Sequence, residues 1–219
     1  MRLDTCDYED QDREGKLKQT IGRHNIHGIL VPGGFGSRGV EGMINVAHYA
    51  MKNKLPYMGI CLGMQVAVIA HARYNCNLSE AHSTEFTQET SHPVVHLMEN
   101  QKNIHGLGGT MRLGAYPAVL QDNSTTLALY KKRYAHRMVN GSTTHERHRH
   151  RYEVNPFYHE TLQQYGMKLA GLSPDGQLVE FIEFEEHPYF LATQAHPEFL
   201  SQLDNAHPLF IGLVQSSKN

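Results

Sequence analysis

The chain has 219 residues, of which 40% are hydrophobic and 19% charged, and its formal net charge is −2. This is the composition of an ordinary globular domain, and a chain of this length forms one sizeable core, so we expect a single domain over residues 1–219. The charge argues against a nucleic-acid-binding surface, and no apolar run reaches the roughly 18 residues that a membrane helix needs. Three cysteines form no paired framework, which favours a reducing, cytoplasmic location without a membrane partner.

The predicted elements alternate along the first third of the chain. Residues 27–31 form a short apolar run that ends in Pro-Gly-Gly, as a buried strand does, and residues 40–54 place their apolar side chains at helical spacing. A second strand over 55–60 and a second helix over 62–74 follow. Strand, helix, strand and helix in this order predict the α/β class, with an open, mostly parallel sheet flanked by helices.

The rest of the chain gives weaker signals. Glycines 106, 108, 109 and 114 indicate turns. Further elements are expected as strands over 115–120 and 151–155, a strand pair over 178–184 and 189–194, and a closing helix over 207–217.

The pentapeptide Gly59-Ile60-Cys61-Leu62-Gly63 lies between the second strand and the second helix. Its glycine spacing is that of a nucleophile elbow, in which a tight turn exposes the central residue. A helix N-terminus favours a thiolate, so we expect the pKa of Cys61 to be lowered, with the amide of Leu62 directed at the attacked carbonyl. The alternative is a core cysteine at a plain strand–helix junction.

A nucleophile needs a base, and the segment Ala195-His196-Pro197-Glu198 supplies one with a carboxylate two residues away. Pro197 disfavours the helical region for His196, so we expect extended backbone there, with the imidazole and carboxylate on the same side. By itself the tripeptide is also compatible with a strand end and a solvated carboxylate.

The glycine pair Gly33-Gly34 follows the first strand and lets backbone amides approach a developing negative charge. A phosphate-binding loop is the rival interpretation. The spacing fits neither the Walker pattern nor the dinucleotide fingerprint, so an oxyanion-stabilising loop is favoured.

Together, segments 28–44, 59–69, 83–86, 106–117, 146–155 and 196–201 closely resemble the glutamine amidotransferase domain of CTP synthases. The elbow and the His-Pro-Glu are general to class I amidotransferases, whereas "GGTMRLG" and "RHRHRYEVN" resemble CTP synthases in particular. The similarity runs from about His27 to the C-terminal helix.

The resemblance implies a Cys–His–Glu triad of Cys61, His196 and Glu198, which would hydrolyse L-glutamine through a glutamyl thioester. The amides of Gly34 and Leu62 would stabilise the oxyanion. The positions that match glutamine-binding residues are Gly33, Phe35, Gln65, Glu85 and Arg151, and those that match a GTP-responsive loop are Phe35 and Arg38. Glu85 suits an ammonium and Arg151 a carboxylate.

The resemblance implies no cofactor or metal in this domain and GTP as an allosteric activator. The ammonia would aminate UTP to CTP in a synthetase domain that uses ATP and Mg and is absent from these residues. This chain alone should therefore not make CTP, and a homo-oligomer is expected only for the full-length enzyme. Two alternatives stay open: a free-standing hydrolase of another γ-glutamyl compound, and an inactive regulatory or assembly homologue.

Several features depart from the family. Residues 1–26 are read as divergent or truncated, so the sheet is expected to lack its first strand and helix. Ala195 replaces an aromatic residue, which should loosen His196, and His82 stands where an asparagine is usual. The histidine-rich segment 145–153 is expected to be a substrate-side loop rather than a zinc site.

Overall fold

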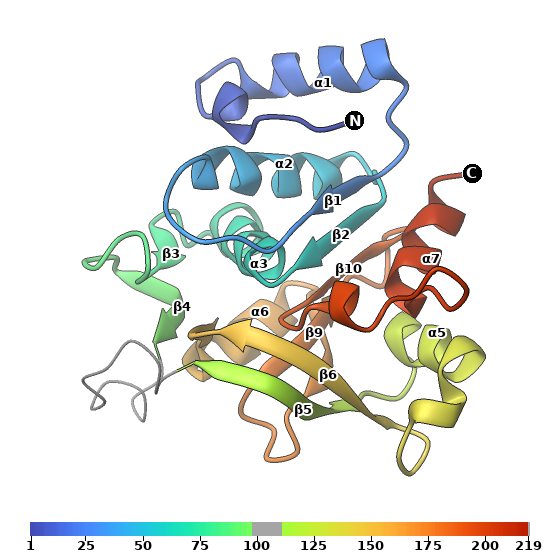
Figure 1. Cartoon of the computed structure of the whole chain (residues 1–219). Helices are drawn as coiled ribbons and strands as arrows, with labels where there is room; N and C mark the ends of the chain where they lie inside the picture. Colours follow the sequence, from blue (N-terminus) through green and yellow to red (C-terminus); the bar gives the residue numbers. More distant parts are fainter. Residues whose placement is uncertain (98–110, 219) are drawn as a thin grey trace.

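The computed structural model describes residues 1–97 and 111–218 (Figure 1). The α-helices are α1 (Arg13–His24), α2 (Val40–Lys52), α3 (Leu62–Tyr74), α5 (Thr125–Arg133), α6 (His159–Gln164) and α7 (Pro208–Ser216). The 3₁₀ helices are η1 (Thr5–Tyr8), η2 (Ala135–Arg137), η3 (Pro156–Tyr158) and η4 (Pro197–Phe199). The strands are β1 (Ile29–Val31), β2 (Tyr57–Ile60), β3 (Ala81–Ser83), β4 (His92–Leu97), β5 (Arg112–Leu120), β6 (Thr143–His150), β7 (Tyr152–Val154), β8 (Lys168–Leu172), β9 (Val179–Glu183) and β10 (Phe190–Thr193).

The main sheet has the strand order β1-β2-β10-β9-β8-β5-β6, and β3, β4 and β7 form a second, smaller sheet. The α/β class is confirmed, but a mostly parallel sheet was the wrong prediction. Only β1–β2 and β2–β10 pair in parallel, whereas every neighbouring pair from β10 to β6 is antiparallel. The sheet changes from parallel to antiparallel pairing between β10 and β9, which a short connection joins. A parallel pair would need a long crossover, whereas a hairpin does not.

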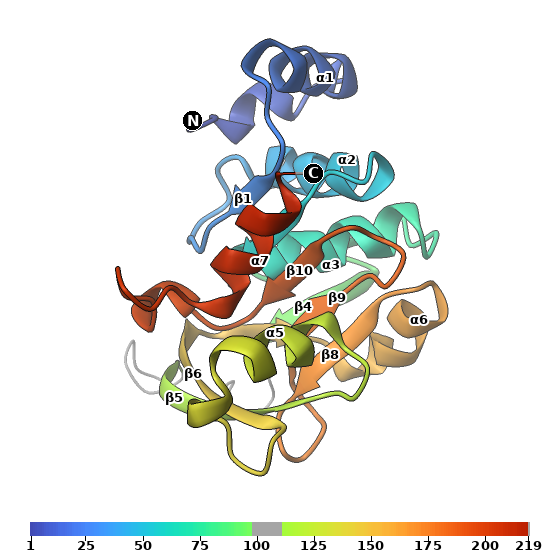
Figure 2. The same ribbon diagram turned by 90° about the vertical axis from the view of Figure 1, so that its right-hand side faces the viewer.

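Both faces of the main sheet are covered (Figure 2). Tyr57 and Phe190 point into a core shared with α2, α3 and α6, while Met58 and Leu191 point into a second core with α5 and α7. This alternation along β2 and β10 is the period of two that a strand imposes. The strands that carry the site are therefore held rigidly from both sides.

The first 26 residues form η1 and α1, which lie on the outer side of α2 (Figure 1). Tyr8 and Leu17 are buried there, and the side-chain amide of Asn45 donates to the Tyr8 carbonyl at 2.9 Å. Within the described residues the sheet ends on this side at β1, where Leu30 is 41% exposed.

The predicted elements 27–31, 40–54, 55–60 and 62–74 correspond to β1, α2, β2 and α3, and the hairpin β9–β10 and the helix α7 are also confirmed. The histidine-rich segment is not a loop. Most of it lies in β6, whose residues alternate between buried and exposed opposite β5. Glycines 106, 108 and 109 lie outside the described residues, and Gly114 lies within β5 at φ +114°.

Candidate active site

Cys61 lies in the turn from β2 to α3 with φ 50° and ψ −102°. This left-handed φ is strained for a residue with a side chain. The flanking glycines allow the turn, because a Cβ on Gly63 would lie 2.1 Å from the Val31 carbonyl oxygen and one on Gly59 would lie 2.6 Å from the Gly63 backbone. The predicted elbow is therefore present in its geometry.

His196 follows β10, which is the neighbour of β2 in the sheet. Its backbone has φ −112° and ψ 83°, as expected before proline, and its Nδ1 lies 2.6 Å from Oε1 of Glu198. The contact forms across the 3₁₀ turn η4 rather than along an extended strand. The imidazole also stacks on Phe199, with ring centroids 5.0 Å apart.

Ala195 is buried, and its amide donates to the hydroxyl of Thr193 at 3.1 Å. No aromatic side chain is present at that position, so Phe199 supplies the stacking partner of His196 from the other side of the proline.

Gly33 joins the two halves of this site. A Cβ built on Gly33 would lie 2.8 Å from Cε1 of His196 and 3.5 Å from Cβ of Cys61, so both side chains lie against the same backbone. At Gly34 a Cβ would lie 3.2 Å from the Leu62 side chain. The glycine loop therefore lies beside the elbow, as the sequence predicted.

The expectation of a lowered thiol pKa was wrong. Burial, together with the smaller effect of the carboxylates of Glu85, Glu198 and Glu153, raises the pKa of Cys61 to about 12. A hydrogen bond from the Leu62 amide acts in the opposite direction but does not compensate. The helix N-terminus is outweighed because Cys61 is only 4% exposed, and an ion in such a place loses its hydration. The neutral thiol is therefore the favoured form of Cys61.

Glu85 lies close enough to both Arg151 and Cys61 to interact electrostatically with each of them. Burial raises the pKa of Glu85, while a hydrogen bond from the Gly36 amide and the charge of Arg151 oppose the rise. Arg151 therefore acts electrostatically on Glu85, and Glu85 acts in turn on the Cys61 thiol.

Gln65, on the first turn of α3, is buried. Its Nε2 donates to the Tyr152 carbonyl at 3.1 Å and to Oε1 of Gln194 at 3.2 Å. The side chain is thereby fixed between the small sheet and the end of β10.

Two further predicted residues lie on the surface. Phe35 is 67% exposed, with the Arg149 guanidinium 5.9 Å from its ring centroid. Arg38 forms an exposed ion pair with Asp4 at 3.3 Å, so it contacts the N-terminal segment. His82 pairs with Glu41, which also forms an ion pair with Arg73.

Sequence reasoning missed Gln194, which is completely buried. Its Nε2 donates to the Cys61 sulfur at 3.6 Å. The only signal was its position two residues before His196, which places it at the same end of β10.

It also missed a buried charge cluster formed by Arg112, His148, His150, Glu153 and Glu180. Arg112 donates to Glu153 at 3.1 Å and to Glu180 at 2.8 Å, and so joins β7 of the small sheet to β9 of the main sheet. Nδ1 of His148 lies 2.9 Å from Nε2 of His150. Burial lowers the pKa of His148 to about 2 and that of His150 to about 3, so both stay neutral. The histidines therefore pack behind the site and are not a substrate loop.

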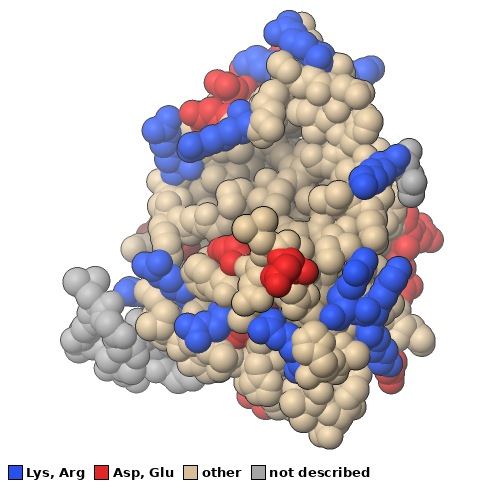
Figure 3. Space-filling model, turned by 45° about the vertical axis from the view of Figure 1, so that its right-hand side comes forward, with Lys and Arg blue, Asp and Glu red and all other residues tan. Residues whose placement is uncertain are grey.

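Exposed arginines of β6 lie beside the segment that carries His196. In Figure 3, Lys and Arg side chains lie over both the upper and the lower parts of the face. The exposed positions of β6 include Arg147 and Arg149, and the carbonyl of Arg147 accepts a hydrogen bond from the His196 amide at 2.7 Å.

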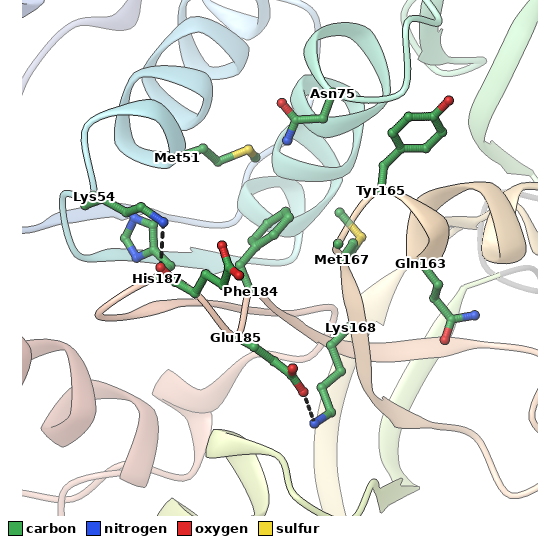
Figure 4. Close-up of a pocket in the computed structure, with 12 residues that line it drawn as sticks. Met51, Lys54, Asn75, Gln163, Tyr165, Met167, Lys168, Phe184, Glu185 and His187 are labelled. Carbon is green, nitrogen blue, oxygen red and sulfur yellow. Dashed lines mark hydrogen bonds and ion pairs between the residues drawn. The ribbon is translucent and has the colours of Figure 1, made fainter.

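A cavity of about 520 Å³ lies elsewhere, near the N-terminal ends of β2 and β10 (Figure 4). Met51, Lys54, Lys168, Phe184 and His187 are among its lining residues, and none of the predicted site residues lines it. Lys168 pairs there with Glu185 at 2.7 Å. The cavity is thus separate from Cys61, which lies at the opposite ends of the same strands.

In the part of the chain that the structure describes, no group of three or more His, Cys, Asp or Glu side chains is arranged to hold a metal ion. Across the same residues, no helix combines the length and apolar character required to cross a membrane.

The chain was compared with known proteins. The sequence profile of the family described as Glutamine amidotransferase class-I matches residues 3–216. A CTP synthase of Methanococcus maripaludis is 53% identical over 98% of this chain, and one of Syntrophus aciditrophicus is 46% identical over 99% of it. The chain spans 38% of the length of each of these relatives.

Among solved structures, the glutaminase domain of the Trypanosoma brucei CTP synthase with bound acivicin superimposes with a TM-score of 0.88 and 34% identity. The alignment covers 100% of this chain and 80% of that one. The chain therefore belongs to the class I glutamine amidotransferases, and within them to the glutaminase domains of CTP synthases.

Proposed function

We propose that this chain hydrolyses the side-chain amide of L-glutamine to glutamate and ammonia through Cys61, His196 and Glu198. The observation that carries the proposal is the meeting at Gly33 of a strained, buried cysteine and an imidazole whose Nδ1 is held by Glu198. A nucleophile, a base and an orienting carboxylate in this order are the parts of a triad.

His196 is the base. Nε2 of His196 is buried and is without a hydrogen-bond partner among the described residues, while Nδ1 is engaged by Glu198. Because burial holds the pKa of Cys61 at about 12, attack has to be coupled to removal of the thiol proton. The proton passes from Sγ to Nε2, the sulfur electron pair forms the C–S bond to the amide carbon, and the C=O pair moves to oxygen.

The amide of Leu62, which already donates toward the Cys61 sulfur, and the amide of Gly34 would stabilise that oxygen. The imidazolium then returns its proton to the nitrogen as the C–N bond breaks, so ammonia leaves and a thioester remains. Water deprotonated by the same Nε2 attacks the thioester, and glutamate is released as the thiol is reprotonated.

The binding residues suit free glutamine. Glu85 would pair with the α-ammonium and Arg151 with the α-carboxylate. Gln65 uses Nε2 for its two hydrogen bonds within the protein, which leaves Oε1 to accept from the ammonium. Gly33 and Phe35 would complete this pocket beside the elbow.

The likeness to CTP synthases supports a proposal for the destination of the ammonia. It would aminate UTP to CTP in an ATP- and Mg-dependent synthetase domain of a cytoplasmic, homo-oligomeric enzyme. GTP would activate the glutaminase through the loop that carries Phe35 and Arg38, where Arg38 already pairs with Asp4.

The test is glutamate release by the purified chain, with and without GTP, for the wild type, Cys61→Ala and Cys6→Ala. Wild type and Cys6→Ala should release glutamate at similar rates, and Cys61→Ala should release none above background. Addition of acivicin, the compound bound to the trypanosomal domain, should abolish release and label Cys61.

Equal release by Cys61→Ala would contradict the proposed nucleophile. A folded wild type that releases no glutamate with or without GTP, and whose Cys61 is not labelled by acivicin, would overturn the proposed function.

A further inference from the structure

The site contains a second amide directed at the nucleophile. Gln194 is completely buried at the end of β10, and its Nε2 donates to the Cys61 sulfur at 3.6 Å. This distance is within the range of hydrogen bonds to sulfur, whose radius is larger than that of oxygen. The proposed triad makes no use of this contact.

Gln194 is fixed at both ends. Its backbone amide donates to the Glu180 carbonyl at 3.0 Å, and its Oε1 accepts from Nε2 of Gln65 at 3.2 Å. Gln65 donates to Oε1 of Gln194, and this contact fixes the orientation of the Gln194 amide. Nε2 of Gln194 therefore has to face the Cys61 sulfur. Gln65 is held in turn by the Tyr152 carbonyl. The donor is therefore positioned before any substrate arrives.

The electrostatic surroundings make this donor important. Glu85, Glu198 and Glu153 all oppose a negative charge on the Cys61 sulfur, and so does burial. Opposing them is the Leu62 amide at the start of α3. The Gln194 amide approaches from a different segment, directly after β10, and a neutral donor favours the charged form of its acceptor.

We propose that Gln194 is a further catalytic residue of the reaction proposed above, whose side-chain amide holds the Cys61 sulfur in place and stabilises the thiolate as His196 takes the proton. The role of Gln65 is to position Gln194. The role of Gln194 in glutamine hydrolysis rests on the proposed function, whereas its stabilisation of the Cys61 thiolate does not. The two are therefore tested separately.

The experiment measures alkylation of Cys61 by iodoacetamide between pH 7 and 10, with the labelled peptide identified by mass spectrometry. Over this range the thiolate is a minor species and the logarithm of the rate rises with pH. In Gln194→Met, which keeps the length of the side chain and removes its donor, the rate should be about tenfold lower at each pH, as expected for the loss of a hydrogen bond to a charged group. If the substitution only loosened the site, iodoacetamide would reach Cys61 more easily and the alkylation rate would rise instead of falling.

The matched control is Gln164→Met, an exposed position on α6, which should label like the wild type. Gln194→Glu is a second variant in case the methionine variant does not fold, and it keeps an acceptor for Gln65 while placing a carboxylate beside the sulfur. It should label at least as slowly as Gln194→Met. Labelling of either folded variant at the wild-type rate and with the wild-type pH profile would overturn the proposal.

Glutamine hydrolysis separates this inference from the function. In Gln194→Met, kcat should fall about tenfold with KM changed less than threefold, because the contact is to the nucleophile. If the wild type hydrolyses no glutamine while Gln194→Met still slows alkylation, the proposed function fails and the effect on the thiol stands. If the wild type is active and kcat of the variant is unchanged, the catalytic role of Gln194 is wrong.

Discussion

Nδ1 of His196 lies 2.6 Å from Oε1 of Glu198, while Nε2 of the same ring is buried and unpartnered among the described residues. The carboxylate therefore selects the tautomer in which the proton is on Nδ1, so that Nε2 is ready to accept one. It does so from a half-exposed position, since the Glu198 side chain is 41% accessible.

Replacing this carboxylate tests the relationship. Glu198→Gln should lower kcat for glutamine hydrolysis about 100-fold with little change in KM, because the amide no longer stabilises the imidazolium. Steady-state kinetics beside Glu186→Gln, an exposed position in the β9–β10 connection, provide the comparison. A Glu198→Gln enzyme with wild-type kcat would show that His196 does not depend on this carboxylate.

The elbow should tolerate no side chain at its second glycine. A Cβ on Gly63 would lie 2.1 Å from the Val31 carbonyl oxygen, which is backbone and cannot rotate away. Gly63→Ala should therefore lower the free energy of unfolding by about 3 kcal/mol, measured by urea denaturation.

Gly22 is the matched glycine control. It lies in α1, and a Cβ there would meet nothing within 4 Å. Gly22→Ala should raise the free energy of unfolding by about 0.5–1 kcal/mol, because alanine loses less backbone entropy in a helix. Equal stabilities of the two variants would argue against close packing of the elbow on β1.

Arg112 joins the two sheets through Glu153 and Glu180, whose side chains are fully buried. Arg112→Met should lower the free energy of unfolding by about 3–5 kcal/mol, since it leaves buried acidic groups without their cation. Arg147→Met, exposed on β6, should be nearly neutral. Urea denaturation of both variants checks this, and a loss below about 1 kcal/mol for Arg112→Met would mean that the cluster does not join the sheets.

Glu153 should leave a signature in the pH dependence of stability. Burial raises the pKa of Glu153 from 4.5 to about 8, although the positive charge of Arg112 acts in the opposite direction. Between these values the unfolded chain releases the proton and the folded chain keeps it, so the free energy of unfolding falls as the pH rises. The glutamine of Glu153→Gln does not titrate, so this variant does not lose stability in that way. The free energy of unfolding of Glu153→Gln, minus that of the wild type, should therefore rise between pH 4.5 and 8.

Thermal unfolding of both proteins across this range provides the measurement. Glu160→Gln, exposed on α6, should give a difference from the wild type that does not change with pH. If the difference in stability between Glu153→Gln and the wild type does not change with pH, Glu153 is ionised in the folded protein at pH 7.

The sequence by itself determined the features that depend on neighbours in the chain. The glycines around Cys61 are required by a turn of five residues, and Pro197 sets the backbone of His196, so both could be recognised locally. The helical spacing of the apolar residues likewise placed α2, because burial on one face repeats with the backbone geometry. The apolar segments of β2 and α3 are buried on all sides and show no such period.

Only the tertiary structure decided which distant segments meet and how deeply they are buried. The antiparallel half of the sheet depends on how β5, β6, β8 and β9 pair, and the contact of Gln194 with Cys61 joins residues 133 positions apart. The pKa of Cys61 followed burial rather than the helix N-terminus. Hydration of an ion is lost according to everything that surrounds it, and a local sequence pattern does not contain that information.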